Sequence, residues 1–166
     1  MMGLGYPGGP IISEYAQRFT GASQKLFPRV FLEKSEFGFS FSGLKSAVKR
    51  VVDERIMQKG ELTVQDQEEI SYEFQNAVNE VLTYKIIEAA RQKRAQTILL
   101  AGGVSANDDL RGKISHEAEK IGVPFLCPTE KLYCMDNAAM IGILAYYRVK
   151  YGKFEEYRGT VQVGKF

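Results

Sequence analysis

The feature that most constrains the fold is the stretch Thr97–Asn107, which reads Thr-Ile-Leu-Leu-Ala-Gly-Gly-Val-Ser-Ala-Asn. Its first five residues are β-branched, aliphatic or small and carry no charge, which predicts a strand buried on both faces. Gly102 and Gly103 then permit a sharp turn in which no Cβ keeps a ligand away from the backbone. Ser105 or Asn107 can cap a helix that begins at Asp108. The stretch therefore predicts a strand, a glycine turn and a helix in succession.

This succession offers a place for a phosphate or a nucleotide, because helix N-termini at the carboxyl end of a sheet bind anions. The same succession also occurs wherever an α/β unit needs a tight turn. From these residues alone, a structural role and a ligand-binding role are equally supported.

The composition of the chain indicates one ordinary soluble domain. Its 166 residues are 45% hydrophobic and 25% charged, and the net charge of +2 gives no general argument for nucleic-acid binding. Cys127 and Cys134 match neither a disulfide framework nor a CxxC pair, so we expect a cytoplasmic protein. No basic leader and no apolar run of about 20 residues is present, so neither secretion nor membrane insertion is indicated.

The residues before this stretch predict mainly helices. The loop Gly3–Pro10 leads into a helix that runs to Phe19. Its pair Gly8-Gly9 is a second place where a ligand can reach bare backbone, although a turn without a ligand is the better interpretation from these residues alone. The segment 26–41 alternates aromatic and small residues and predicts short strands or extended segments packed on one face. A helix follows from Ser42 to Gly60, and another, capped at Thr63, runs to about Arg94.

One cluster of cations is a candidate for phosphate contacts: Arg29, Lys45, Lys49 and Arg50. A solvated helix face is the simpler interpretation of the three lysine and arginine residues on the helix. The long helix to Arg94 carries an apolar stripe, and nothing on it looks catalytic.

After the glycine turn the pattern predicts a helix over 108–122, a second buried strand over 123–127 and a helix of small residues that begins at Ala138. Asp136 or Asn137 can cap that last helix, and a carboxylate in this position is also where α/β proteins hold a cation. His116 is the only histidine, so it cannot form a common zinc or iron set.

Five segments together resemble the carboxy-terminal half of the TsaD/Gcp family, and the resemblance covers essentially the entire chain. In order, they are Gly-Tyr-Pro-Gly-Gly-Pro at 5–10, Phe-Pro-Arg at 27–29, Phe-Ser-Phe-Ser-Gly-Leu-Lys at 39–45, Ala-Gly-Gly-Val-Ser-Ala-Asn at 101–107 and Cys-Met-Asp-Asn-Ala-Ala-Met at 134–140.

The resemblance implies an α/β fold, namely part of the carboxy-terminal lobe of an actin/Hsp70-type (ASKHA) ATP-binding protein, helix-rich with a short, mostly parallel sheet. The expected organisation is a single fragment domain over 1–166, with a helical and loop-rich region over 1–95, a βαβα nucleotide-binding part over 96–152 and a tail over 153–166. The implied activity is transfer of threonylcarbamoyl from threonylcarbamoyl-AMP to the tRNA adenosine beside the anticodon.

The resemblance also implies site residues and partners. Gly9 and Asn107 resemble substrate or nucleotide contacts, Gly102 and Gly103 belong to the same nucleotide turn, and Asp136 resembles a carboxylate ligand of an iron or zinc ion. Met135 stands where threonine is commoner in the family, which affects the surroundings of that ligand. The implied partners are tRNA and the small accessory proteins TsaB and TsaE.

The family's two metal-binding histidines and its first lobe have no counterpart in this sequence, which contains His116 alone. We therefore expect a fragment that is inactive by itself and that self-associates through exposed apolar surface. Two alternatives remain open at this point. One is a metallopeptidase, as the older family name O-sialoglycoprotein endopeptidase suggests, and the other is a noncatalytic nucleotide- or partner-binding module.

Overall fold

A computed structural model describes residues 1–30 and 37–152 of the chain. The chain divides into two compact units, Met1–Cys134 and Met135–Phe166. The predicted tail over 153–166 and the segment 31–36 lie outside the described residues. None of the helices formed by the described residues combines the length and the apolar character that a membrane span requires.

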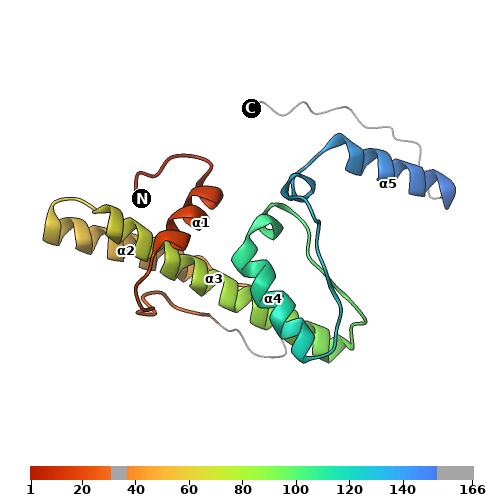
Figure 1. The fold of residues 1–166 in the computed structure, drawn as a ribbon, viewed down its shortest axis with the longest axis horizontal. Helices are drawn as coiled ribbons and strands as arrows, with labels where there is room; N and C mark the ends of the chain where they lie inside the picture. The colour runs from red at the N-terminus through yellow and green to blue at the C-terminus, as the bar shows by residue number, and fades with distance from the viewer. Residues whose placement is uncertain (31–36, 153–166) are drawn as a thin grey trace. The chain divides into compact units, whose positions relative to one another are not determined.

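The first unit is built around the helix α3 (Val64–Lys93), which contacts α1 (Gly8–Arg18), α2 (Ser42–Lys59) and α4 (Asp108–Lys120), as Figure 1 shows. The predicted cap at Thr63 is confirmed, because its side chain accepts a hydrogen bond from the backbone N–H of Asp66 while Asp66 bonds back to the N–H of Thr63. The last helical residue is Lys93, and the C-cap Arg94 adopts a left-handed conformation.

Apolar side chains form two separate clusters along α3. The first lies against its N-terminal half and contains these buried residues: Phe27, Leu44, Ala47, Val48, Val52, Ile70 and Ala77. The second lies against its C-terminal half and contains Ile87, Ala90, Ile98, Leu110, Ile114 and Ala118. α3 is therefore the element that both clusters share.

The sheet has two short parallel strands, β1 (Ile98–Leu99) and β2 (Phe125–Leu126), paired Ile98 to Phe125 and Leu99 to Leu126. The prediction that these strands are buried on both faces is wrong. Ile98 is 7% exposed, whereas Leu99 is 75% exposed. The reason is that Ile98 and Phe125 pack in the second cluster with side chains of α4, whereas Leu99 and Leu126, which alternate with them along the strands, are exposed. The coarser prediction of a helix-rich α/β fold with a short parallel sheet is confirmed.

Of the two structures predicted for 26–41, short strands or extended segments packed on one face, the described residues 26–30 and 37–41 form no strand. Instead of pairing with another strand, this segment binds side chains of α3. The buried carboxylate of Glu73 accepts hydrogen bonds from the backbone N–H groups of Gln24 and Leu26, and the ring of Phe27 is buried in the first cluster. Alternating aromatics thus mark an extended segment packed on a helix here.

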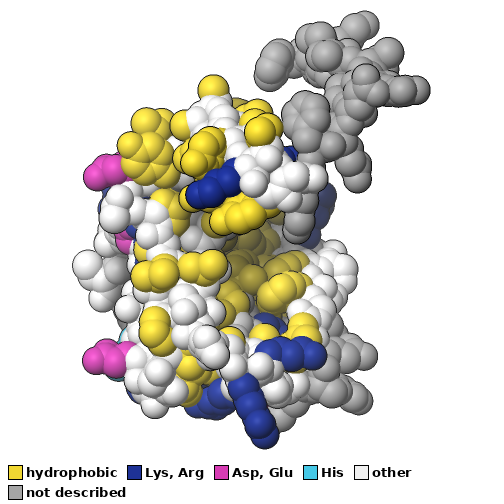
Figure 2. Space-filling view, turned by 90° about the vertical axis from the view of Figure 1, so that its right-hand side faces the viewer, with side chains coloured by type: hydrophobic (Ala, Val, Ile, Leu, Met, Phe, Trp, Pro, Cys, Tyr) yellow, Lys and Arg dark blue, Asp and Glu magenta, His cyan; other side chains and the backbone are white. Residues whose placement is uncertain are grey.

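In the second unit, α5 (Ala138–Lys150) begins after Asn137, whose side chain accepts a hydrogen bond from the backbone N–H of Met140 at 3.1 Å. Asn137 is therefore the cap. No residue of α5 is buried. The face of the molecule in Figure 2 carries many apolar side chains together with Lys and Arg, and few acidic ones.

Candidate functional site

The predicted glycine turn lies between β1 and a short 3₁₀ helix, η1 (Gly103–Ala106). Gly102 has φ = +87°, a conformation that L side chains rarely adopt, so this position requires glycine. A Cβ at Gly102 or Gly103 would meet no atom within 4 Å, so both glycines border open space. The turn is closed by a hydrogen bond of 2.9 Å from the N–H of Ser105 to the carbonyl of Gly102.

Asn107, at the end of this turn, is the N-cap of α4 and is half-buried. Its Oδ1 accepts hydrogen bonds from the backbone N–H of Leu110 at 2.9 Å and from Nδ2 of Asn79 at 3.1 Å. Its Nδ2 donates to Oε1 of Gln75 at 2.8 Å. The candidate ligand-binding amide is therefore fixed by two side chains of α3.

The predicted site does not include Gln75 and Asn79, because the apolar stripe is the dominant pattern of the long helix. They belong to a row of uncharged polar residues that recur every four positions and are all buried: Ser71, Gln75, Asn79 and Thr83. Residues four apart lie above one another on a helix, so the row was readable as a polar ridge. Buried polar groups need hydrogen-bond partners. Asn107, the N-cap of α4, is such a partner for both Gln75 and Asn79.

The network continues to the surface beyond Asn79. Its Nδ2 also donates to Oδ2 of Asp109 at 2.8 Å, and Asp109 in turn is paired with the ammonium of Lys113. Lys113 also bonds to Oδ1 of Asn76 at 3.2 Å. The N-terminal turn of α4 is thus tied to α3 through a chain of polar contacts.

Arg111 holds the other side of the glycine turn. Its Nε donates to the carbonyl of Ser105 in η1, and one of its terminal nitrogens lies 3.1 Å from Sγ of Cys134. Cys134 ends a second 3₁₀ helix, η2 (Lys131–Cys134), and its side chain is 3% exposed. One guanidinium therefore links η1 to η2.

The second predicted ligand position, Gly9, lies in the first turn of α1 and is exposed. A hollow of about 670 Å³ lies beside that turn, lined mainly by apolar side chains of α2, α3 and the first residues of the chain, with Gly8 on its wall. Lys45 also lines it. None of the described residues that line this hollow belongs to the turn Gly102–Asn107, so the hollow does not join the two predicted contacts.

The other cations considered for phosphate contacts have acidic partners. The side chain of Arg29 is 10% exposed and pairs with Glu80 at 2.9 Å, while Lys49 and Arg50 pair with Asp53 and Glu54 one turn along α2. Arg29 therefore has a structural role, and the cations of α2 form a solvated face.

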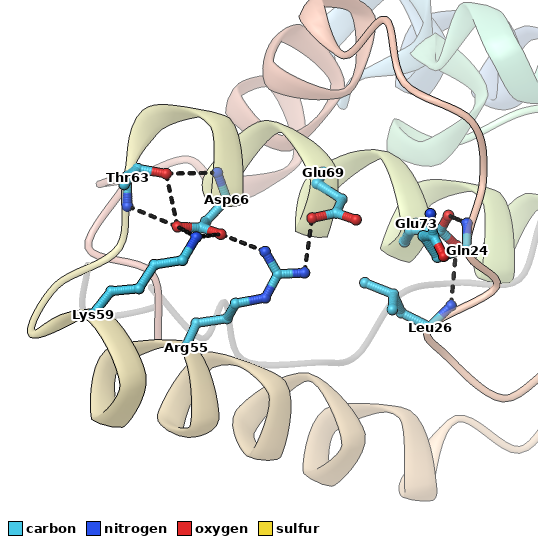
Figure 3. Close-up of polar contacts among 8 residues, drawn as sticks. All are labelled: Gln24, Leu26, Arg55, Lys59, Thr63, Asp66, Glu69 and Glu73. Carbon is cyan, nitrogen blue, oxygen red and sulfur yellow. Dashed lines mark hydrogen bonds and ion pairs between the residues drawn. The ribbon is translucent and has the colours of Figure 1, made fainter.

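The two most buried acidic side chains of α3, Asp66 and Glu73, also serve the fold, as Figure 3 shows. Asp66 accepts hydrogen bonds from Lys59 at 2.8 Å, from Thr63 and from Arg55, which also binds Glu69 at 2.8 Å. Burial alone would raise the pKa of the Asp66 carboxyl, but these hydrogen bonds outweigh burial and hold the pKa well below its usual range. The cluster therefore clamps α2 against the start of α3.

Asp136, the predicted metal ligand, is exposed in the second unit. The described residues contain no group of three His, Cys, Asp or Glu side chains that could hold a metal ion. A single carboxylate does not provide the three or four ligands of an iron or zinc site. The described residues therefore do not fit a metal ion by themselves.

Comparison with known proteins identifies the relatives of this chain. The sequence model of the family "TsaD: tRNA N6-adenosine threonylcarbamoyltransferase" matches residues 1–143. Proteins named tRNA N6-adenosine threonylcarbamoyltransferase are similar to it, among them one from Desulfotalea psychrophila, 44% identical over 149 residues that cover 89% of this chain and 42% of the relative. A second, from Clostridioides difficile strain 630, is 42% identical over 92% of this chain and 44% of its own length.

A third relative, from Staphylococcus aureus strain Newman, is 38% identical over 93% of this chain and 44% of the relative. The chain thus spans less than half the length of these curated relatives. The family model nevertheless matches residues 1–143, and the alignment with the Desulfotalea psychrophila relative covers 89% of this chain. The residues matched by the model include the glycine turn and the cap of α4. The chain belongs to the TsaD family of tRNA N6-adenosine threonylcarbamoyltransferases.

Proposed function

We propose that this chain provides part of a two-lobed, actin/Hsp70-type ATP-binding enzyme that transfers threonylcarbamoyl from threonylcarbamoyl-AMP to the tRNA adenosine beside the anticodon. The observation that carries the proposal is the family match over residues 1–143. The role proposed for the chain is to bind the adenylate at the turn Gly102–Asn107, with Gly9 as a further contact.

The geometry of the turn supports this role. The open space beside Gly102 and Gly103 lets a ligand approach the backbone, and the N-terminus of α4 with its fixed amide at Asn107 lies directly after it. Helix N-termini favour anionic groups. Holding the adenylate rigidly there accelerates transfer by orienting it toward the attacking amine of the tRNA.

Asp136 would be one ligand of an iron or zinc ion. The described residues do not supply the further ligands that such an ion requires. The tRNA substrate follows from the family, whereas TsaB and TsaE as partners and a cytoplasmic location remain predictions. Self-association is also a prediction, and the exposed apolar residues of α5 support it.

A chimera tests the proposed function. In the Desulfotalea psychrophila relative, the 149 matched residues are replaced by those of this chain, and the chimera is assayed with tRNA and threonylcarbamoyl-AMP by mass spectrometry of the nucleosides. We expect modified adenosine, and a strong loss when the chimera carries Asn107→Ala. A folded chimera without activity, beside an active parent, overturns the proposal.

The 166-residue chain alone is expected to be inactive in the same assay, because it supplies one carboxylate toward the metal and a single wall of the proposed adenylate site. Modified tRNA made by the chain alone would contradict this expectation. No observation on the described residues favours a metallopeptidase, since they contain no group of side chains that could hold its metal ion.

A further inference from the structure

We propose that Gln75 and Asn79 are positioning residues that orient the Asn107 carboxamide so that it presents one N–H to the ligand. This point of the site then recognises a hydrogen-bond acceptor and rejects a donor. The inference rests on the proposed function, in which Asn107 contacts an adenine nucleotide, and adds to it the residues and the polarity of that contact.

The orientation of the amide is fixed from one end by the backbone. The N–H of Leu110 is only a donor, so the Asn107 atom that lies 2.9 Å from it is the oxygen. The amide nitrogen then necessarily faces Oε1 of Gln75, at 2.8 Å. Reversing the amide would oppose two donors at Leu110 and two acceptors at Gln75.

The orientation is fixed from the other end by a carboxylate. Nδ2 of Asn79 lies 2.8 Å from Oδ2 of Asp109 and 3.1 Å from Oδ1 of Asn107, so its two protons are both donated to acceptors. Asn79 is 3% exposed, so a reversed Asn79 amide would leave buried polar groups without hydrogen-bond partners, which is costly. Both ends of the network therefore impose the same polarity on Asn107.

The remaining hydrogen-bonding capacity of Asn107 follows by counting. Its oxygen has two acceptor positions and both are filled, by Leu110 and Asn79. Its nitrogen has two protons, and one is donated to Gln75. Within the described part of the chain the second proton has no partner, so the side chain of Asn107 can offer a ligand a donor and no acceptor.

The amide signals of the 166-residue chain test the orientation without a ligand. In a ¹⁵N–¹H spectrum, the Nδ2 signals of Asn107 are assigned by their disappearance in Asn107→Asp, and the proton donated to Gln75 is expected downfield of its position in a free amide. Gln75→Met should move that proton toward the free-amide position, whereas Gln75→Glu should keep it downfield, since a carboxylate also accepts from Asn107. Asn76→Met is the matched control on the same helix, because Asn76 contacts Lys113 and not Asn107.

Titration of the chimera, in which the remainder of the relative completes the site, with AMP tests the contact to the ligand. We expect AMP to shift the second Nδ2 proton of Asn107 and Gln75→Met to raise the Kd for AMP about fivefold, the effect of roughly one hydrogen bond. Gln75→Glu should restore affinity toward that of the unaltered chimera. Asn107→Asp keeps the cap of α4 but removes both donors, so it should raise the Kd at least about tenfold.

The outcomes separate the inference from the proposed function. If AMP binds and Gln75→Met or Asn107→Asp binds it equally well, the positioning role is wrong and the proposed function stands. If the chimera does not bind AMP, the proposed adenylate site fails, and the contact to the ligand fails with it. The spectra of the free chain then still decide the orientation, and an Nδ2 proton that keeps its position in Gln75→Met would overturn that too.

Discussion

The guanidinium of Arg111 lies 3.1 Å from the sulfur of Cys134 and also bonds to the carbonyl of Ser105. Because Ser105 belongs to η1 and Cys134 to η2, one side chain of α4 connects the two segments that flank the exposed ends of the strands. The position of the glycine turn therefore depends on a residue that the motif itself does not contain.

Replacing Arg111 by Met should loosen this turn, because the Ser105 carbonyl loses its donor. We expect a loss of about 1–2 kcal/mol in the free energy of unfolding. Urea titration measures that loss, and hydrogen exchange at the N–H of Asn107, which bonds to the carbonyl of Val104, locates it. Lys131→Met, which breaks an exposed pair with Asp108, should change stability little. Equal effects of the two variants would contradict the role of Arg111.

Gly102→Ala should destabilise the chain by about 1–2 kcal/mol, because φ is +87° at this position. Gly103→Ala is the matched control. A Cβ at either position meets no atom within 4 Å, so the two variants differ in backbone conformation and not in crowding. We expect a clear fall in thermal midpoint for Gly102→Ala only. A similar fall for both variants would show that the turn conformation is not the cause.

Glu73→Gln should detach the segment before Phe27 from α3. The carboxylate of Glu73 is fully buried, and its Oε1 accepts from the N–H of Gln24 while its Oε2 accepts from the N–H of Leu26. In glutamine an NH₂ group replaces one of these oxygens, so a donor then faces a backbone donor. We expect a loss of about 2 kcal/mol, measured by urea denaturation. Glu14→Gln, in an exposed pair with Arg18, is the control and should be nearly neutral. A neutral Glu73→Gln would contradict the structural role of this carboxylate.

Asp66 should make the chain sensitive to acid. Its pKa in the folded chain lies below that of an unfolded aspartate, about 4, so its contribution to stability is fully present above that pH and is lost as the pH falls further. Asp66→Asn should cost about 2 kcal/mol at pH 7, and the gap to the unaltered chain should be constant from pH 5 to 8 and narrow below pH 4. Chemical denaturation across this range measures the gap. A gap that widens toward low pH would contradict the shift in pKa.

Local sequence patterns predicted the elements of this fold well where each pattern has one physical cause. Thr63, Asn107 and Asn137 were readable as caps because their side chains satisfy the free N–H groups at the start of a helix. Exposure was not readable in the same way. An uncharged run such as Thr97–Ala101 is compatible with one or two covered faces, and the number of covering helices decides between them.

The candidate site was predicted in part for the same reason. Gly102 and Asn107 carry local signals, because a left-handed turn and a helix cap are properties of neighbouring residues. Gln75 and Asn79 act on Asn107 from about 30 residues away in the sequence, and only the packing of α4 on α3 brings them together. The ligand contacts predicted for Gly9, Gly102, Gly103 and Asn107 and the metal contact predicted for Asp136 all stay predictions, since the described contacts do not test them.

The division of the apolar residues into two clusters on one helix has a consequence for how this unit unfolds. Each cluster holds only half of α3, and a half-helix of about 15 residues is marginally stable once its packing is lost. The unit therefore consists of two small folding units that share one helix, and we expect its two halves to unfold at different denaturant concentrations. The row of buried polar residues in the middle of α3 then determines how strongly the unfolding of one half destabilises the other.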